Sequence, residues 1–341
     1  MSTNIGKEIK NIIRDNTTPM VTIVCITYNH EKYIEQCLEG FLSQNCNFNF
    51  EVFIHDDAST DNTPIILEKY EKKYPDIIKV IYEDENQHSK GVKIIPDIML
   101  PKINSKYIAL CEGDDYWIDP NKLQMQYDIL ETHKDCNFCV HNVVKINEDG
   151  SLTGQYVVVD KVNEGVIFPR DLVRLTYNYN FQTSSYFMRT ARLKEFFKQN
   201  PMFKQVSIVG DVPILLYFAS IGNSYYINRI MSAYRLYSMS SFTKKIRDSK
   251  TYLCKLEKAH VSLYNEYNIY TNNKYKKECD RAIKHYELLY YVHSGNYKMA
   301  SKKEYREYLF KMGCLFFVIV NFKARFPKIS KIIYRVLKRE Y

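Results

Sequence analysis

From Val21 to about Leu130 the chain alternates short apolar runs with segments of helical periodicity, and this alternation constrains the fold most strongly. Apolar runs of this length predict buried strands. The helical segments between them predict crossovers on the faces of a parallel sheet, which makes the fold class α/β. Strands are expected at residues 21–26, 50–55, 77–82 and 106–111. Helices are expected at residues 31–43, 61–73 and 119–130, with Asp61 as the cap of the second.

Polar side chains follow three of these predicted strands at the point where each strand ends. Thr27-Tyr28-Asn29 follows the first strand, Asp56-Asp57 the second, and Glu112-Gly113-Asp114-Asp115 the fourth. In sheets of this kind, ligands bind beyond the carboxyl ends of the strands. The three segments are therefore expected to form one ligand site.

The carboxylates of Glu112, Asp114 and Asp115 repel one another unless a cation or a polar ligand lies among them. Mg2+ and Mn2+ prefer oxygen ligands of this kind and commonly share them with phosphates. The alternative is an acidic surface turn. Neither G-x-G-x-x-G nor G-x-x-x-x-G-K occurs in the chain, so a metal rather than backbone amides is expected to neutralise a diphosphate.

The pattern beyond residue 135 is looser. A helix is expected from about Val209 to Ile221, with Asp211 near its positive end, and helices dominate from Ser249 onward. Breaks are expected near Asn272-Asn273 and Gly295. Further strands are expected at residues 138–146, 155–160, 183–188, 225–227 and 233–237. The domain boundaries predicted from these patterns are an N-terminal arm at 1–19, an α/β domain at 20–240 and a helical region at 241–341.

Composition and charge fit a globular enzyme, with 45% hydrophobic and 26% charged residues. The formal net charge of +9 is concentrated in the C-terminal part, which favours a local anionic surface, either membrane or substrate, over nucleic acid. Nine cysteines, an odd number, predict reduced intracellular thiols. The polar stretch Met1 to Pro19 is expected to be neither a signal peptide nor an anchor, so the expected localisation is cytoplasmic.

Two further segments have two interpretations each. Cys136-Asn137-Phe138-Cys139, with His141 nearby, is either a set of core thiols on a strand or half of a zinc site that lacks a second ligand pair. The apolar run 312–320 is too short to span a membrane. A helix beginning at Pro327 would carry Ile329, Ile332, Ile333, Val336 and Leu337 on one face and cations on the other. This helix either docks on its own domain or lies peripherally on anionic lipid.

The order of the strand-end motifs, followed by Gly210-Asp211 and Tyr234-Arg235, resembles family 2 glycosyltransferases over roughly residues 20 to 240. The resemblance implies a GT-A fold, here with a C-terminal helical extension. It also implies a nucleotide-diphosphate sugar donor, a divalent cation (Mn2+ or Mg2+) and inversion at the anomeric carbon. Similar short members act in bacterial surface-polysaccharide assembly.

The resemblance also implies roles for individual residues. Tyr28 corresponds to the residue that stacks on the donor base, and Asp57 to the acid that bonds the base, commonly uracil. Asp114 and Asp115 match the acidic pair that reaches the ribose and holds the metal, and Asp211 aligns with the general base. The other residues expected to contact donor or acceptor are Thr27, Asn29, Glu112, Trp117 and Arg235. For Asp211 a helix-capping role remains open, and for Trp117 a packing role.

Departures from the family pattern narrow the expectation. Glu112 stands where many members have an Asp, and Tyr237 stands where many relatives have a His. The Gln-x-x-Arg-Trp motif of processive synthases is missing, which points to one sugar transferred per encounter. The alternatives are a catalytically inactive sugar-binding or scaffolding module and a sugar nucleotidyltransferase. A nucleotidyltransferase would be expected to carry a Gly-rich loop after the first strand.

Overall fold

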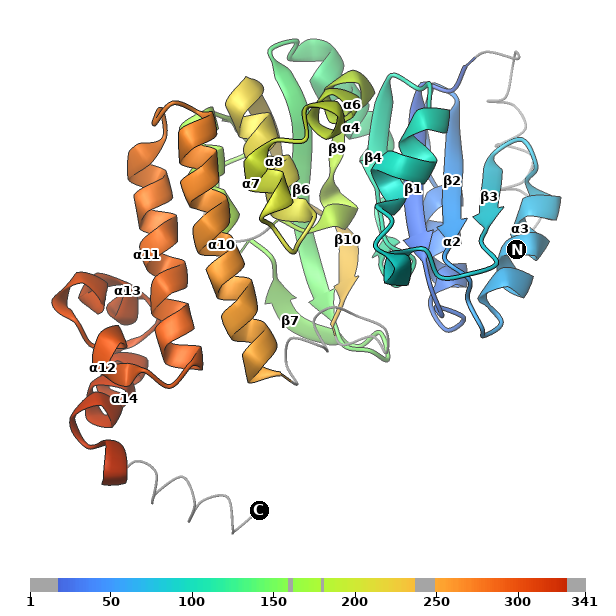
Figure 1. Cartoon of the computed structure of the whole chain (residues 1–341). Helices are drawn as coiled ribbons and strands as arrows, with labels where there is room; N and C mark the ends of the chain where they lie inside the picture. Colours follow the sequence, from blue (N-terminus) through green and yellow to red (C-terminus); the bar gives the residue numbers. More distant parts are fainter. Residues whose placement is uncertain (1–17, 159–161, 179–180, 237–248, 330–341) are drawn as a thin grey trace. The chain divides into compact units, whose positions relative to one another are not determined.

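The computed structural model describes residues 18–158, 162–178, 181–236 and 249–329 (Figure 1). The chain divides into two compact units. The sheet unit comprises residues 1–200 and 214–244, and the helical unit comprises residues 201–213 and 245–341. Residues 201–213, which the sequence pattern groups with residues 20–240, therefore belong to the helical unit.

One mixed sheet organises the sheet unit, with the strand order β3-β2-β1-β4-β9-β6-β10-β5. Strands β3, β2, β1 and β4 are parallel, β9 is antiparallel to both of its neighbours, and β10 is parallel to β6. Off this path, β7 pairs with β6 and β8 pairs with β10. The strands are β1 (Val21–Thr27), β2 (Phe50–Asp56), β3 (Ile78–Tyr82), β4 (Tyr107–Leu110), β5 (Tyr116–Trp117), β6 (Cys136–Ile146), β7 (Leu152–Tyr156), β8 (Gly165–Ile167), β9 (Phe187–Arg189) and β10 (Asn223–Arg235).

Helices connect the strands of the sheet unit. The α-helices are α2 (Ile34–Leu42), α3 (Thr63–Lys73), α4 (Lys122–Thr132), α5 (Pro169–Asn178) and α6 (Thr190–Gln199). The shorter helical segments are η1 (His88–Lys90), η2 (Ile94–Met99), η3 (Leu100–Lys102) and η4 (Thr183–Ser185). Helix α8 (Asp211–Ile221) begins in the helical unit and continues into the sheet unit.

The apolar runs that predict the first four strands are buried as expected. Six of the seven residues of β1 and all four residues of β4 are buried, because helices cover both faces of a parallel sheet. Cys136 and Cys139 of β6 belong to the same hydrophobic core, which confirms the core interpretation of these thiols. The strand order places β1 between β2 and β4. The strand order reverses between β1 and β4, and in α/β sheets ligands commonly bind beyond the carboxyl ends of the strands at such a point.

Several sequence-based boundaries are wrong in detail. Residues 183–185 form η4 rather than a strand, because the Ser185 hydroxyl donates to the Gln182 carbonyl and favours a local turn. Strand β7 ends at Tyr156 and does not reach residue 160. The two strands expected at 225–227 and 233–237 are one strand, β10, which stays paired with β6 through register shifts between Ile227 and Ser232.

The N-cap of α3 lies one residue beyond Asp61, the residue predicted for that position. Asn62 occupies the N-cap position, and it makes no side-chain capping bond. Asp61 lies just before it and still accepts a hydrogen bond from the backbone N–H of Thr63 at 2.9 Å. The carboxylate therefore satisfies a free N–H of the first helical turn from outside the helix.

The helical unit is built around α10 and α11, which pack along each other (Figure 1). Its elements are α7 (Met202–Gln205), α10 (Lys250–Tyr270), α11 (Lys276–His293), α12 (Tyr297–Ala300), η5 (Lys303–Tyr305), α13 (Arg306–Lys311) and α14 (Cys314–Arg325). The expected break between the long helices is present, where Asn272 and Asn273 adopt positive φ angles of 50° and 60°. In the parts of the chain that the structure describes, no helix combines the length and the apolar character needed to cross a membrane.

Candidate active site

The loops after β1 and β2 are joined by side-chain hydrogen bonds. The Asn29 amide oxygen accepts from the backbone N–H of Thr60 at 2.7 Å, and the Asn29 N–H donates to the Ser59 hydroxyl at 2.8 Å. The Glu31 N–H donates to Asp61 at 3.0 Å. Asn29 has a positive φ of 55°, a conformation that asparagine tolerates better than most residues. These hydrogen bonds fix the segment that follows Tyr28, whose side chain is half-buried.

Asp57 lies beyond β2 with only 2% of its surface exposed. Its carboxylate accepts hydrogen bonds from the backbone N–H groups of Gln87 at 2.7 Å and His88 at 3.1 Å. It therefore anchors the segment that leads into η1. Each carboxylate oxygen accepts one of these bonds and has a second lone pair with which it can bind a ligand. The expected bond to a donor base stays a prediction.

Gly113 brings the turn after β4 into direct contact with the end of β1. A Cβ atom at Gly113 would lie 2.7 Å from the Thr27 hydroxyl and 2.9 Å from His30 Nδ1. These two side chains also share a hydrogen bond of 3.1 Å. Only glycine permits so close an approach. Residues from two of the predicted strand-end motifs, Thr27 and Gly113, are therefore packed against each other.

His30 is surrounded by carboxylates but stays neutral at neutral pH. Burial lowers its pKa, and the negative charges of Asp114, Asp61 and Asp56 oppose that effect without overcoming it. The charges of Asp56, at the end of β2, and of Asp114, after β4, both act on this one imidazole. That the strand ends form one ligand site stays a prediction.

The three acidic side chains after β4 differ in burial. Glu112 is exposed, Asp114 is half-buried, and Asp115 is 1% exposed. Asp115 Oδ1 accepts from the backbone N–H of Arg235 at 2.9 Å, whereas Oδ2 has no partner among the described residues. Burial raises the pKa of Asp115 well above its ordinary value, and the charges of Asp114 and Glu112 add to the effect. A buried carboxylate of this kind is stabilised by a nearby cation.

The oxygens of these acidic residues suit a hard divalent cation that shares its ligands with a phosphate group. The unpartnered Oδ2 of Asp115 and the adjacent carboxylate of Asp114 are the candidate ligands. Within the described residues, no group of three or more His, Cys, Asp or Glu side chains is arranged to hold a metal. A cation here would therefore need a bound diphosphate or water to complete its coordination.

Arg235, at the end of β10, is buried and supports residues 112–115, the acidic turn after β4. Its Nε donates to the Asp114 carbonyl at 3.0 Å, and Nη1 donates to the Glu148 carbonyl at 2.8 Å. Nη2 donates to the Gln36 side chain at 3.0 Å, and the guanidinium lies 4.5 Å from the centre of the Tyr33 ring. With 3% of its surface exposed, Arg235 positions the site. Its expected contact with donor or acceptor stays a prediction.

Trp117 packs inside the fold. It is 2% exposed, its Nε1 donates to the Ser184 carbonyl at 3.1 Å, and its ring meets Phe41 edge-on at 4.8 Å. Lys122 Nζ lies 3.8 Å from the centre of the same ring. These contacts are those of a side chain packed in the core, as the packing interpretation expects. A role in sugar binding stays a prediction.

Asp211 belongs to the helical unit, where it begins α8. Its Oδ1 accepts from the adjacent backbone N–H of Val212 at 2.8 Å. Its charge acts on His260 of α10 and on Tyr286 of α11, whose rings stack with their centres 4.3 Å apart. Asp211 therefore has neighbours that the sequence motifs did not indicate.

Sequence reasoning did not identify the residues that brace the site through Arg235. No sequence motif contains Gln36, Glu148 or Tyr33. Gln36 lies 199 residues from Arg235 in the sequence, and Glu148 lies 87 residues from it. The His30 ring bonds to the Thr27 hydroxyl and thereby supports the end of β1. The Gly within Glu112-Gly113-Asp114 was the available signal for the close approach, since glycine marks places where backbone and neighbours meet tightly.

Beyond β1, β2 and β4, at the switch point of a mixed sheet, the protein therefore presents a set of carboxylates and small polar residues. This arrangement is that of a GT-A glycosyltransferase fold. Residues 22–197, more than half of the chain, match the model of glycosyl transferase family 2, and the chain belongs to this family. Family membership confirms the resemblance drawn from the strand-end motifs.

Individual relatives match part of the chain. An uncharacterized protein of Mycobacterium tuberculosis is 42% identical over 40% of this chain and 38% of its own length. The Escherichia coli protein WfaP, named as a UDP-Glc:α-D-GlcNAc-diphosphoundecaprenol β-1,3-glucosyltransferase, is 30% identical over 43% of this chain and 55% of its own length. The matches thus cover between 38 and 55% of these curated relatives.

The fold is shared with a solved structure. Residues 1–349 of S. aureus TarS, crystallised with UDP-GlcNAc, superpose with a TM-score of 0.58 at 16% identity. The superposition covers 85% of this chain and 79% of that structure. At this level of identity the similarity establishes the GT-A architecture.

Proposed function

We propose that the protein transfers a single sugar, with inversion, from a nucleotide-diphosphate sugar to a hydroxyl group of a glycan or lipid-linked acceptor. The observation that carries the proposal is the contact between the segments after β1, β2 and β4 of a family 2 chain, where Gly113 lies against Thr27 and Asn29 bonds to Ser59 and Thr60. A UDP-sugar is the proposed donor, because the relative WfaP is named as a UDP-glucose-dependent enzyme. Its lipid-diphosphate acceptor supports the acceptor class, in bacterial surface-polysaccharide synthesis.

The proposed donor site uses the loops after β1, β2 and β4. Tyr28 stacks on the base, with Thr27 and Asn29 shaping its loop, and Asp57 bonds the base with the lone pairs that its backbone contacts leave. Asp114 reaches the ribose and, with Asp115, holds Mn2+ or Mg2+. A bound divalent cation would stabilise negative charge on the departing diphosphate.

A chelation experiment tests the metal part of the proposal. EDTA should abolish transfer, and Mn2+ or Mg2+ should restore it. Asp115→Asn keeps an oxygen that accepts from the Arg235 N–H, so it should stay folded while losing activity. The exposed Asp128→Asn on α4 is the matched control and should retain activity. Full activity of wild type in EDTA would exclude a metal role for Asp115.

Asp211 is proposed as the general base that takes the proton from the acceptor hydroxyl. Removing a positioned base typically lowers the rate about 10²- to 10⁴-fold. Asp211→Asn should therefore bind donor almost normally and transfer poorly. Asp171→Asn, which alters a half-buried aspartate in the first turn of α5, is the control. If Asp211→Asn loses thermal stability but keeps its turnover per folded molecule, Asp211 is only a helix cap.

The protein is further proposed to act in the cytoplasm as a peripheral protein on the inner face of the plasma membrane. Helix α14 exposes Leu315, Val318 and Phe322 and carries Lys323 and Arg325 in its last turn. Apolar and basic residues together favour binding to anionic lipid. Most of the amphipathic helix expected beyond Pro327, residues 330–341, lies outside the described residues.

Co-sedimentation with liposomes tests the membrane proposal. Binding should require anionic lipid, weaken as salt is added, and disappear when residues 323–341 are removed. Equal recovery of the full-length and truncated proteins in the supernatant would leave the docked-helix interpretation instead.

A further inference from the structure

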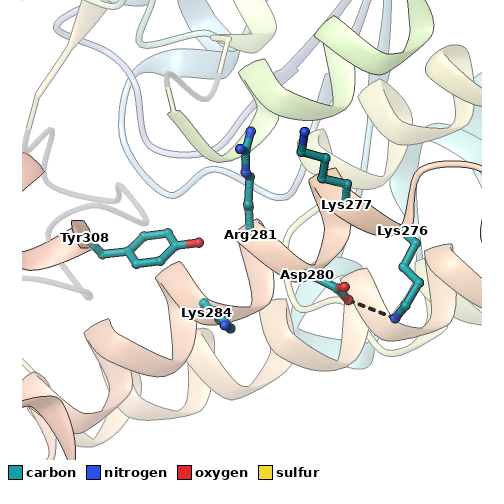
Figure 2. A pocket seen from close by; sticks show the side chains of 6 residues that line it. All are labelled: Lys276, Lys277, Asp280, Arg281, Lys284 and Tyr308. Carbon is teal, nitrogen blue, oxygen red and sulfur yellow. Dashed lines mark hydrogen bonds and ion pairs between the residues drawn. The ribbon is translucent and has the colours of Figure 1, made fainter. Parts of the chain in front are cut away.

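The helical unit contains a pocket of about 530 Å³ between α11 and α13 whose lining is almost entirely charged. Figure 2 shows Lys277 and Arg281 extending in the same direction from α11, with the Tyr308 hydroxyl directed toward that helix. The lining residues are Lys276, Lys277, Asp280, Arg281, Lys284 and Tyr308. Four cations against one carboxylate give the pocket a net charge of +3.

Among the residues that the structure describes, one of these cations has an ion-pair partner. Lys276 pairs with Asp280 at 3.3 Å, the ion pair drawn in Figure 2. Lys277, Arg281 and Lys284 have no ion pair with any described residue. Their spacing of four and three positions places them on one face of α11, where like charges repel one another. An anion among them would remove that repulsion.

The second wall of the pocket is held in place by buried contacts. Tyr305 of η5 is 3% exposed, and its hydroxyl donates to Glu287 of α11 at 2.9 Å. Tyr305 also meets the ring of Tyr291 edge-on at 5.8 Å. These contacts fix the start of α13 against α11, so Tyr308 faces the cations from a fixed element. A charged helix face that only kept the protein soluble would not need a second element fixed opposite it.

The Tyr308 hydroxyl is a hydrogen-bond donor at neutral pH. Burial raises the pKa of this phenol, and the nearby Arg281 charge opposes the rise without cancelling it. The pocket thus offers ammonium, guanidinium and hydroxyl donors. Guanidinium groups bind phosphate oxygens in a bidentate manner, and lysines bind them as point charges.

We propose that the pocket between α11 and α13 binds a phosphate or diphosphate group, with Arg281, Lys277, Lys284 and Tyr308 as its donors. This site is separate from the proposed donor site, and it goes beyond the proposed transfer reaction. The phosphate belongs either to a soluble phosphorylated compound or to the head group of a lipid. Both sources present the same oxygens to the pocket, so the experiment has one arm for each.

The first arm measures binding of inorganic diphosphate to the full-length protein by calorimetry. EDTA is present, so that the metal-dependent carboxylate site stays silent. Wild type should bind, and Lys277→Gln with Arg281→Gln should weaken binding at least about 10-fold, because charge-assisted hydrogen bonds are lost. The control removes the same charge from exposed positions outside the pocket, as Lys255→Gln with Lys298→Gln, and should bind like wild type.

Tyr308→Phe separates recognition in the pocket from general attraction by positive charge. It removes one donor and leaves the net charge unchanged, so we expect binding to weaken about 3- to 10-fold. The altered lysine and arginine form no ion pair with a described residue, so the pocket variants should melt close to the wild-type temperature. Absence of diphosphate binding by wild type, or equal binding by the pocket and control variants, would overturn the proposal.

The second arm distinguishes the two sources of the phosphate. Vesicles of phosphatidylcholine with phosphatidic acid are sedimented with the same variants. If the pocket variant loses vesicle binding relative to the control variant and also loses diphosphate binding, the ligand is a lipid head group. If it loses only diphosphate binding, the ligand is a soluble phosphate. Either result supports the site, and the transfer assay plays no part in the decision.

Discussion

Gly113→Ala tests the close contact between the turn after β4 and the end of β1. The added methyl group would lie 2.7 Å from the Thr27 hydroxyl, 2.9 Å from Thr27 Cβ and 2.9 Å from His30 Nδ1. Contacts below 3.0 Å between such atoms force a displacement. Neither neighbour has room to move, since Thr27 is 1% exposed and His30 is 8% exposed.

The free energy of unfolding should fall through two effects. Overpacking of a well-filled interior costs about 1–3 kcal/mol. Loss of the 3.1 Å hydrogen bond between Thr27 and His30 adds about 0.5–1.5 kcal/mol. Together we expect a loss of about 2–4 kcal/mol. Activity should fall as well, because Glu112 and Asp114 flank the displaced residue and catalysis is sensitive to small misplacements.

Urea unfolding provides the assay, followed by circular dichroism and by fluorescence. Trp117 is the only tryptophan and packs against Phe41, so its emission reports on the sheet unit. Gly210→Ala is the control, since a Cβ there would meet no atom within 4 Å, and it should unfold within about 0.5 kcal/mol of wild type. If Gly113→Ala matches this control in stability and keeps its activity, the proposed contact does not constrain the site.

Two further substitutions test charged residues inside the sheet unit. Arg235→Lys keeps the positive charge, but a lysine ammonium cannot reproduce the planar guanidinium that donates to Asp114, Glu148 and Gln36. The free energy of unfolding in urea should therefore fall by about 3 kcal/mol or more. Arg192→Lys, in an exposed pair, should cost less than about 0.5 kcal/mol, and equal midpoints for the two variants would contradict the bracing role. Lys122 is fully buried, and burial lowers its pKa to about 7. In the unfolded chain a lysine keeps its proton up to a pH of about 10.4, so the unfolded state binds more protons above pH 7. Between pH 7 and 8.5, the free energy of unfolding of wild type should therefore rise by about 1.5 kcal/mol relative to that of Lys122→Met. A pH-independent difference in unfolding free energy would show that Lys122 stays charged.

The first four strands, the helices between them and the three polar segments at the strand ends can be predicted from the amino-acid sequence alone. These features depend on local periodicity and on the rule that ligands bind at the carboxyl ends of parallel strands. The predicted strand at 106–111 and the strand β4 (Tyr107–Leu110) differ by one residue at each end. Residues 183–185 were misassigned because hydroxyl side chains bonded the local backbone, an outcome that periodicity does not register.

The side chains that support residues 112–115, and the contacts between distant segments, follow from the folded arrangement and not from local sequence patterns. The Arg235 guanidinium meets Asp114, Glu148 and Gln36 across 121, 87 and 199 residues of sequence. Asp57 is bonded to the segment before η1, and Tyr308 faces α11 because Tyr305 is tied to Glu287. Such partners are set by the order of the strands and the packing of the helices. Local sequence patterns encode the elements, whereas the contacts between distant elements depend on how the whole chain fills its core.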